Sequence, residues 1–238
     1  MSAIARSLIV NADDFGLSPG VNAGVVRALE AGIVTSASLM VRALCAADAA
    51  ELWRRHPHLS LGLHIDLGEW TRDATGWRPV YSFADVDDAD AVRHETSRQL
   101  MRFRELTARN PTHLDSHQHV HRKEPVRSVL VEMANALEVP LRHESPHVRY
   151  CGDFYGQSED GTSYPEWIRA ERLVTLVASL RPGTTELCCH PSSADDVDTL
   201  YRSERLMELE ALCDPRVRAA LRAQDIRLCS FSDVPVAS

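Results

Sequence analysis

Short apolar runs alternate with helical patterns along most of the chain, and this alternation limits the fold more than any other feature of the sequence. The first unit shows it clearly: residues 7–10 form an apolar run, Ser18 can cap the helix that follows, Pro19 fits its first turn and Gly32 ends it. Strands and helices that alternate in this way are typical of β-α units built around a parallel sheet. The sequence therefore predicts an α/β fold.

The same pattern locates the other elements. Including the first run, we predict strands at residues 7–10, 34–41, 61–65, 112–116, 141–143, 186–189 and 226–230. We predict the later helices at residues 46–55, 89–108, 124–137, 165–180 and 203–223, the last broken at Asp214-Pro215. The stretch from Gly68 to Asp90 is expected to be a long loop. About seven parallel strands favour a closed or nearly closed (β/α) barrel, with an open doubly wound sheet as the competing topology.

Size and charge narrow the class of protein. The chain has 238 residues and 44% hydrophobic composition, which one core can support, so we expect a single domain over residues 1–238. The formal charge of -8 provides no basic field for a nucleic acid or an anionic membrane. The apolar run at residues 8–10 is too short for a signal peptide or a membrane span, so we expect a cytoplasmic protein. The sequence leaves a homodimer open.

Two adjacent carboxylates, Asp13 and Asp14, follow the first predicted strand. Unpaired buried charge is costly, so such a pair is solvated, caps a helix or holds a cation. The helix starts at Ser18, which is too far along the chain for either aspartate to be its N-cap. Neighbouring strand residues point to opposite faces, so both carboxylates reach one site only if the chain turns there. Phe15-Gly16 is consistent with such a turn.

Histidines gather at the ends of the third and fourth predicted strands. His64 shares one face of its strand with Asp66, while leucine and isoleucine occupy the other face. The segment from His113 to His121 carries four histidines and one aspartate on the odd-numbered face of an extended chain, and His117 and His121 would also align on a helix. Imidazoles together with carboxylates suit a divalent metal such as zinc. Spacing alone does not select which histidine binds it.

His190 follows the sixth predicted strand and precedes a proline that ends it. With His190, four separate segments bring carboxylate or imidazole groups to the C-terminal ends of predicted strands, where barrel enzymes build their active sites. Packing does not explain this coincidence, because packing needs apolar residues there. Since imidazole exchanges protons near physiological pH, His190 is a candidate general acid or base.

Taken together, these residues resemble those of a known family, the YdjC-like carbohydrate deacetylases, which include chito-oligosaccharide deacetylases. The resemblance spans residues 7 to about 192, and the portion beyond Ser192 matches only loosely. The motifs that carry it, in order, are Asn11 to Leu17 (NADDFGL), Ile33 to Ser36 (IVTS), Gly62 to His64 (GLH), Thr112 to His121 (THLDSHQHVH), Asp153 to Gly156 (DFYG) and Cys189 to Pro191 (CHP).

The resemblance implies a distorted β/α barrel related to polysaccharide deacetylases, with one divalent metal ion, Mg²⁺ or Zn²⁺. Position by position, it implies that Asp14, His64 and His117 are the metal ligands and that Asp13 is the general base. By analogy with related deacetylases, His190 is the preferred proton donor to the leaving amine. His119 and His121 are then expected either to support the metal ligands from behind or to face the substrate.

The implied function is a hydrolase acting on carbon-nitrogen bonds, which removes the N-acetyl group of an amino sugar or chito-oligosaccharide. Phe154 and Tyr155 form either an apolar wall against a sugar ring or a separate packing cluster. One alternative keeps the metal site but hydrolyses another ester, a lactone or a phosphate ester. A second alternative is a non-catalytic sugar-binding protein with this fold, against which an intact Asp13 argues, because a protein that only binds needs no base beside the metal.

Overall fold

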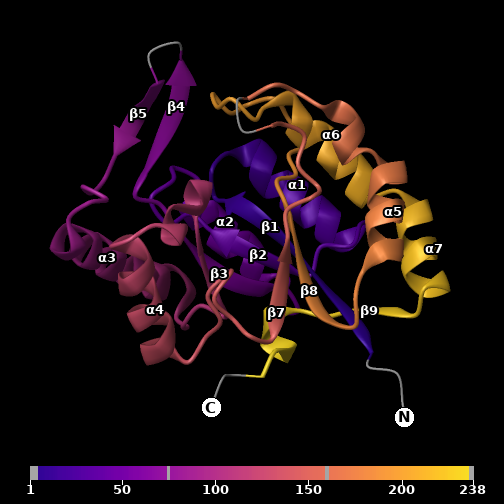
Figure 1. Cartoon of the computed structure of the whole chain (residues 1–238), viewed down its shortest axis with the longest axis horizontal. Helices are drawn as coiled ribbons and strands as arrows, with labels where there is room; N and C mark the ends of the chain where they lie inside the picture. The colour runs from indigo at the N-terminus through magenta and orange to yellow at the C-terminus, as the bar shows by residue number, and fades with distance from the viewer. Residues whose placement is uncertain (1–4, 74–75, 159–160, 236–238) are drawn as a thin grey trace.

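The computed structural model describes residues 5–73, 76–158 and 161–235 (Figure 1). Seven strands form one sheet, and every strand pair in it is parallel. These strands are β1 (Arg6–Phe15), β2 (Ser36–Leu39), β3 (Ser60–Ile65), β6 (Leu114–Ser116), β7 (Val148–Cys151), β8 (Gly183–Cys189) and β9 (Ile226–Leu228). The predicted α/β fold with about seven parallel strands is confirmed.

The strand order explains how the sheet curls. Neighbouring strands follow the order β6-β3-β2-β1-β8-β7, and β9 pairs with the start of β1. Counted around a ring from β1, the strands therefore appear in chain order, as they do in a β/α barrel. Among the described residues β6 and β7 do not pair, so the barrel is open between them. This distorted, open barrel matches the expected architecture and excludes the doubly wound alternative.

Helices connect the strands and cover the outside of the sheet, with α3 and α4 on one flank and α5, α6 and α7 on the other (Figure 1). Their bounds are α1 (Pro19–Glu30), α2 (Ala46–Arg54), α3 (Ala89–Thr107), α4 (Val126–Leu137), α5 (Ala170–Ser179), α6 (Ser203–Leu212) and α7 (Pro215–Ala223), with short 3₁₀ turns η1 (His117–Arg122), η2 (Pro165–Ile168) and η3 (Phe231–Asp233). In α1 the Ser18 hydroxyl accepts from the Val21 amide, and in α7 Asp214 caps in the same way. No helix among the described residues is long and apolar enough to cross a bilayer.

The alternation of side chains along β1 separates the core from the polar interior. Leu8 and Val10 pack in the main core beneath the helices, whereas Ile9 belongs to a smaller apolar cluster with Phe231. Asn11 lies on the same face as Ile9, further along β1, and its side-chain amide donates to the carboxylate of Asp13. The inside of the barrel is therefore apolar at the start of β1 and polar at its C-terminal end, where the functional side chains gather.

Two expectations about the position of strands were wrong. Residues 141–143 do not form a strand: Leu141 makes one isolated bridge to Leu114, and the strand in this part of the chain is β7, which begins at Val148. The expected loop from Gly68 to Asp90 contains an antiparallel hairpin, β4 (Gly68–Asp73) with β5 (Gly76–Ser82), before α3 begins at Ala89. Its strands belong to a separate two-stranded sheet and project away from the barrel (Figure 1).

Candidate active site

A bulge at the end of β1 turns two neighbouring carboxylates into one site. The pairing of β1 with β2 shifts register between Ala12 and Phe15, and Asp14 has a φ of 61°, in the left-handed region. The Leu17 amide then donates to the Asp14 carbonyl, closing a turn that contains Gly16 at φ 104°. The predicted turn is therefore present, but it starts at Asp14 itself. Without it, strand alternation would send the two carboxylates to opposite faces of the sheet.

The first group of side chains is Asp14, His64 and His117, from β1, β3 and the start of η1. Asp14 Oδ1 lies 3.2 Å from His64 Nε2 and 3.2 Å from His117 Nδ1. One donor atom from each residue lies within 4.8 Å of the other two. These three residues, predicted as metal ligands, are thus brought together by three separate elements.

The outer contacts of this group hold its donor atoms in place. His64 Nδ1 lies 2.7 Å from Asp115 Oδ1, which leaves Nε2 with its lone pair toward the group. Arg205 donates to Asp14 Oδ2 at 2.7 Å and leaves Oδ1 facing the two imidazoles. Histidine nitrogen and carboxylate oxygen are ordinary ligands for a divalent cation, and a carboxylate behind a ligating histidine is a common supporting arrangement. The three residues therefore fit a metal ion.

The second group surrounds Asp13, the neighbouring carboxylate. Arg142 donates to both of its oxygens, at 2.7 and 2.8 Å, and Asn11 donates to Oδ1 at 2.8 Å. The thiol of Cys188 approaches Oδ2 at 3.3 Å and is a weak donor. Oδ1 thus has two strong donors, whereas Oδ2 has one, so Oδ2 is the oxygen with capacity to accept a further proton.

Arg142 is fully buried and binds three carboxylates at once. Burial alone would raise the pKa of Asp13, but the adjoining guanidinium holds this pKa far below its usual range. In contrast, burial raises the pKa of Glu186 to about 7, although Arg142 lowers it in part. If Asp13, Asp115 and Glu186 were all ionised, their three negative charges would exceed the single positive charge of Arg142. Arg142 therefore keeps Asp13 ionised at neutral pH.

His190 lies beside Asp13 at the end of β8. Its Nε2 is 4.0 Å from Asp13 Oδ2, and its Nδ1 is 3.7 Å from Glu208 Oε1. Glu208 also accepts from the His190 amide and from the hydroxyl of Tyr201. Tyr155 stacks on Tyr201, with ring centroids 4.4 Å apart, and meets the His190 ring edge-on. The imidazole is thus held between a carboxylate from α6 and two tyrosines, one side of it facing Asp13.

The histidines of the HLDSHQHVH segment do not share one extended face. β6 ends at Ser116, and the backbone of Gln118 and His119 is left-handed, so the chain coils into η1. His113 is buried against Ser38 and stacks on Phe231 at 3.8 Å, in contact with the site of Gly62, where a Cβ would clash with its ring. Burial lowers its pKa to about 3. Only His117 joins Asp14 and His64, while His119 and His121 lie in a different cluster.

Several residues of the site were not singled out from the sequence. They are Asn11, Ser38, Arg142, Glu186, Arg205 and Glu208. One signal was available: Glu186 and Arg142 are charged residues within short predicted strands, and an ion that is buried in a sheet needs a partner. For Arg205 and Glu208 no such signal exists, because they look like ordinary polar residues of α6.

The assignment of His117 rather than its neighbours can be tested directly. We expect His117→Ala to lose one equivalent of bound divalent metal, with a fall in affinity larger than the roughly 10–100-fold that loss of an outer-sphere partner costs. His94→Ala, an exposed histidine on α3, is the control and should keep its metal. Elemental analysis after dialysis measures both. An unchanged metal content in His117→Ala would assign the ligand to another histidine.

Comparison with known proteins shows what this chain is similar to. A family model described as YdjC-like protein matches residues 7–223. The chitooligosaccharide deacetylase of Salmonella schwarzengrund is 34% identical over 250 aligned positions, which cover 96% of this chain and 99% of the relative. A solved structure from Enterococcus faecalis, described as a cellobiose-phosphate cleavage protein, superposes with a TM-score of 0.77 at 23% identity, covering 96% of this chain and 98% of that one. The family 4 carbohydrate esterase of Streptomyces lividans, solved with acetate, has a TM-score of 0.58 at 14% identity and 99% coverage of both chains.

Proposed function

Because this chain belongs to the YdjC-like protein family, we propose that it is a metal-dependent carbohydrate deacetylase, which hydrolyses the N-acetyl group of an amino sugar or chito-oligosaccharide and releases acetate. The observation that carries the proposal is the convergence of Asp14, His64 and His117 directly beside Asp13 and His190. A hydrolase needs a site for an electrophile and groups that move protons on either side of it, and these five residues supply both.

In this proposal Asp14, His64 and His117 hold one divalent ion. When bound, the ion supplies Lewis acidity, lowering the pKa of water and polarising an amide carbonyl. Two imidazoles and one carboxylate suit Zn²⁺. The carboxylates of Asp14 and Asp115 give the site the negative charge that Mg²⁺ also requires, so both ions remain in the proposal.

Asp13 acts as the general base. Its Oδ2 accepts the proton of the attacking water, since Oδ1 already receives two strong hydrogen bonds. Arg142 fixes the plane of the carboxylate through both oxygens and keeps the group ionised, so that a proton acceptor is present before substrate arrives. The same buried ion pair excludes water from the inner side of the base.

His190 donates the proton that the leaving amine needs. Its Nε2 faces Asp13 and its Nδ1 faces Glu208, so the ring is oriented by a carboxylate on each side. A proton donated by His190 can be replaced by the one that Asp13 collects, because the two groups are 4.0 Å apart. The proton that Asp13 takes from water thus replaces the proton that His190 gives to the amine, and both residues return to their starting protonation states.

The proposed place for a sugar ring is a cavity that Tyr155 connects to His190. Tyr155, which meets the His190 ring, lines a cavity of about 290 Å³ together with Trp167, Asp153, Gln157 and Arg172. Aromatic faces with polar groups around them suit a carbohydrate, which has apolar ring faces and hydroxyl edges. Phe154, by contrast, is buried in the core. Of the two aromatics that the sequence indicated, Tyr155 is therefore the one proposed to contact substrate.

Loss of His190, the proposed general acid, should affect amide and ester substrates differently. We expect His190→Ala to lower turnover on N-acetylated substrates by about 100-fold, the lower end of the range for proton-transfer groups, because solvent can partly protonate the amine. A substrate with an acetyl ester needs less help from the acid, since an alcohol leaves more readily than an amine. The ratio of ester to amide turnover should therefore rise in His190→Ala. An equal loss of turnover on the ester and the amide substrate would contradict the role of His190 as general acid.

The pH dependence of metal binding follows from the two imidazoles. Burial lowers the pKa of His64 and of His117, but nearby carboxylates raise both pKa values by more. Asp115 and Asp14 act on His64, and Asp14 acts on His117, so each pKa lies above its usual value. Near neutral pH protons therefore compete with the metal, and affinity should fall as pH falls, by about tenfold per pH unit for each proton displaced. Calorimetric titration between about pH 6 and about pH 8 measures this slope. A flat profile would contradict ligation by these histidines.

The proposal itself is tested by acetate release from a panel of substrates. N,N'-diacetylchitobiose, longer chitin oligomers and monomeric N-acetylglucosamine cover the amino sugars, while an acetylated xylan, a lactone and a phosphate monoester cover the other electrophiles. We expect acetate from at least one amino sugar and free amine in equal amount. Hydrolysis of a lactone or a phosphate monoester with no acetate from any amino sugar would favour a different hydrolase, and no hydrolysis of any member would favour a protein that only binds sugar.

A further inference from the structure

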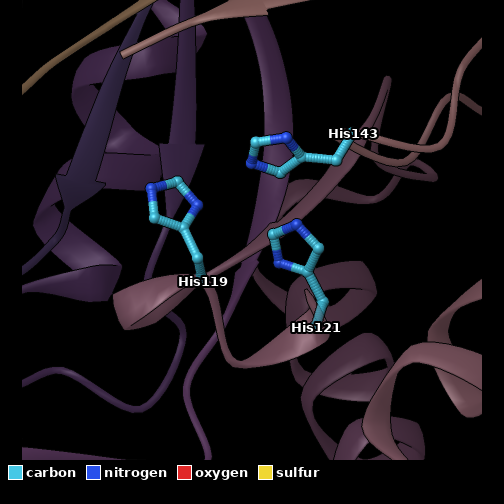
Figure 2. A group of neighbouring side chains, drawn as sticks. All are labelled: His119, His121 and His143. Atoms are coloured by element: carbon cyan, nitrogen blue, oxygen red, sulfur yellow. The ribbon is translucent and has the colours of Figure 1, made fainter. Parts of the chain in front are cut away.

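Three histidines that the proposed reaction does not use form a cluster of their own. His119 and His121 belong to η1, and His143 follows the bridge at Leu141. Figure 2 shows the three rings turned toward one shared space. Their ring centroids are 5.4 to 5.8 Å apart, and one nitrogen from each lies within 4.8 Å of the other two.

Two of the rings are held by one nitrogen and leave the other without a partner. His121 Nδ1 bonds the hydroxyl of Ser116 at 2.6 Å, and His119 Nε2 bonds the hydroxyl of Tyr150 at 3.2 Å. The remaining nitrogens, His121 Nε2 and His119 Nδ1, are buried, and within the described part of the chain neither has a hydrogen-bond partner. Buried polar atoms are ordinarily satisfied, so two such atoms in one cluster need an explanation.

The backbone of the cluster points to the same explanation. His119 has a φ of 52° and His143 a φ of 69°, although residues with a Cβ disfavour the left-handed region. These conformations turn both imidazoles inward against His121, which is fully buried. A chain that only needed packing here could use apolar side chains in relaxed conformations. Strained, inward-facing imidazoles with unused nitrogens are instead what a ligand set requires.

The charge around the cluster does not prevent cation binding. Arg122 and Glu144 carry opposite charges near His143. The other neighbouring cation is Arg142, with its guanidinium 5.3 Å from the centre of the Tyr150 ring. Its charge is offset by ion pairs to Asp13, Asp115 and Glu186, at 2.6 to 3.0 Å. His143 is exposed, which gives an ion a route from solvent to the buried nitrogens.

We propose that His119, His121 and His143 form a second metal site, separate from the active site and selective for Zn²⁺ or a similar imidazole-binding ion. The donors are nitrogen atoms alone, which Mg²⁺ and Ca²⁺ do not favour. Zn–N bonds of about 2.0–2.1 Å require the nitrogens to be closer than the 4.8 Å limit, and the exposed ring of His143 can rotate to close the set. Ser116 and Tyr150 are the supporting partners that orient two of the ligands.

A zinc ion here would connect η1 to the segment after Leu141. Those two segments carry His117, a proposed ligand of the active site, and Arg142, which holds Asp13. The proposed ion would therefore link the backbone segments on both sides of the reaction centre.

The test is a zinc count on five proteins, the wild type and four variants, each stripped with a chelator and titrated with Zn²⁺ by calorimetry. We expect two equivalents per chain in the wild type, one in His143→Ala, one in His117→Ala and none in the double variant His117→Ala/His143→Ala. His147→Ala, an exposed histidine on the same segment, is the matched control and should keep two. With Mg²⁺ alone, His143→Ala and the wild type should bind equally.

The outcomes separate the two sites. As many zinc equivalents in His143→Ala as in the wild type would overturn the second site, whatever happens at the first. A single wild-type equivalent that His143→Ala abolishes and His117→Ala retains would support the second site and contradict the proposed ligands of the active site. Circular dichroism of each variant controls for folding, and exposed His143 is the ligand whose loss disturbs the core least.

Discussion

Replacing Asp13 with asparagine is expected to lower the turnover of acetate release by about 10²–10⁴-fold, the usual range for loss of a general base, while the metal stays bound. Asparagine has nearly the same shape, but its amide cannot accept the water's proton. Asp14, His64 and His117 are untouched, so the metal content should not change. KM should change much less than kcat.

Asp115→Asn is the matched variant, because Asp115 is equally buried and also bound to Arg142. Its role is to orient His64, so its loss should weaken metal affinity by about 10–100-fold. Saturating metal should therefore restore much of the turnover in Asp115→Asn and none in Asp13→Asn. If a high metal concentration restored the turnover of Asp13→Asn, Asp13 would only support the metal site and would not be the general base.

Replacing Arg142 with methionine is expected to destabilise the fold by about 3–5 kcal/mol, the usual cost of removing one partner from a buried ion pair. Methionine fills a similar volume, but Asp13, Asp115 and Glu186 would remain buried without their cation. One of these carboxylates should then take up a proton, so the variant should regain stability as the pH is lowered. That sign follows because carboxylates that lose a cation bind protons more tightly in the folded than in the unfolded state.

Urea unfolding monitored by circular dichroism gives the comparison for Arg142→Met. Arg127→Met is the control, since Arg127 pairs with Glu144 and Glu124 on the exposed side of α4, where ion pairs contribute little. Equal losses in the two variants would mean that the three buried carboxylates are already neutral in the folded protein, and that Arg142 does not hold Asp13 ionised.

The fold was largely predictable because its signals are local. Ser18 and Pro19 mark the start of α1 to the residue, since capping needs only the neighbouring amides. β7 was missed because its four residues, from Val148 to Cys151, have no distinctive run and depend on pairing with β8. The β4–β5 hairpin was missed because β5 is mostly exposed and carries no clear alternation of apolar side chains.

The candidate site was predictable only in part, for a related reason. Motif resemblance selected Asp13, Asp14, His64, His117 and His190, and the structure brings these residues together, their roles remaining predictions. The residues that support them come from distant parts of the chain: Arg205 lies 191 positions from Asp14 and Arg142 lies 129 positions from Asp13. Spacing carries no information about such pairs. The left-handed backbone at Gln118 and His119, which divides the histidine segment into separate groups, was equally hidden.

The most direct measurement is acetate release from chitin oligomers by one preparation in three states: stripped of metal, reloaded with Zn²⁺ or Mg²⁺, and reloaded as Asp13→Asn. If Asp14, His64 and His117 hold the ion and Asp13 activates the water, only the reloaded wild type releases acetate at full rate, in equal amount with free amine. Release that survives stripping, or release by reloaded Asp13→Asn at the wild-type rate, would contradict a metal-dependent deacetylase built on these residues.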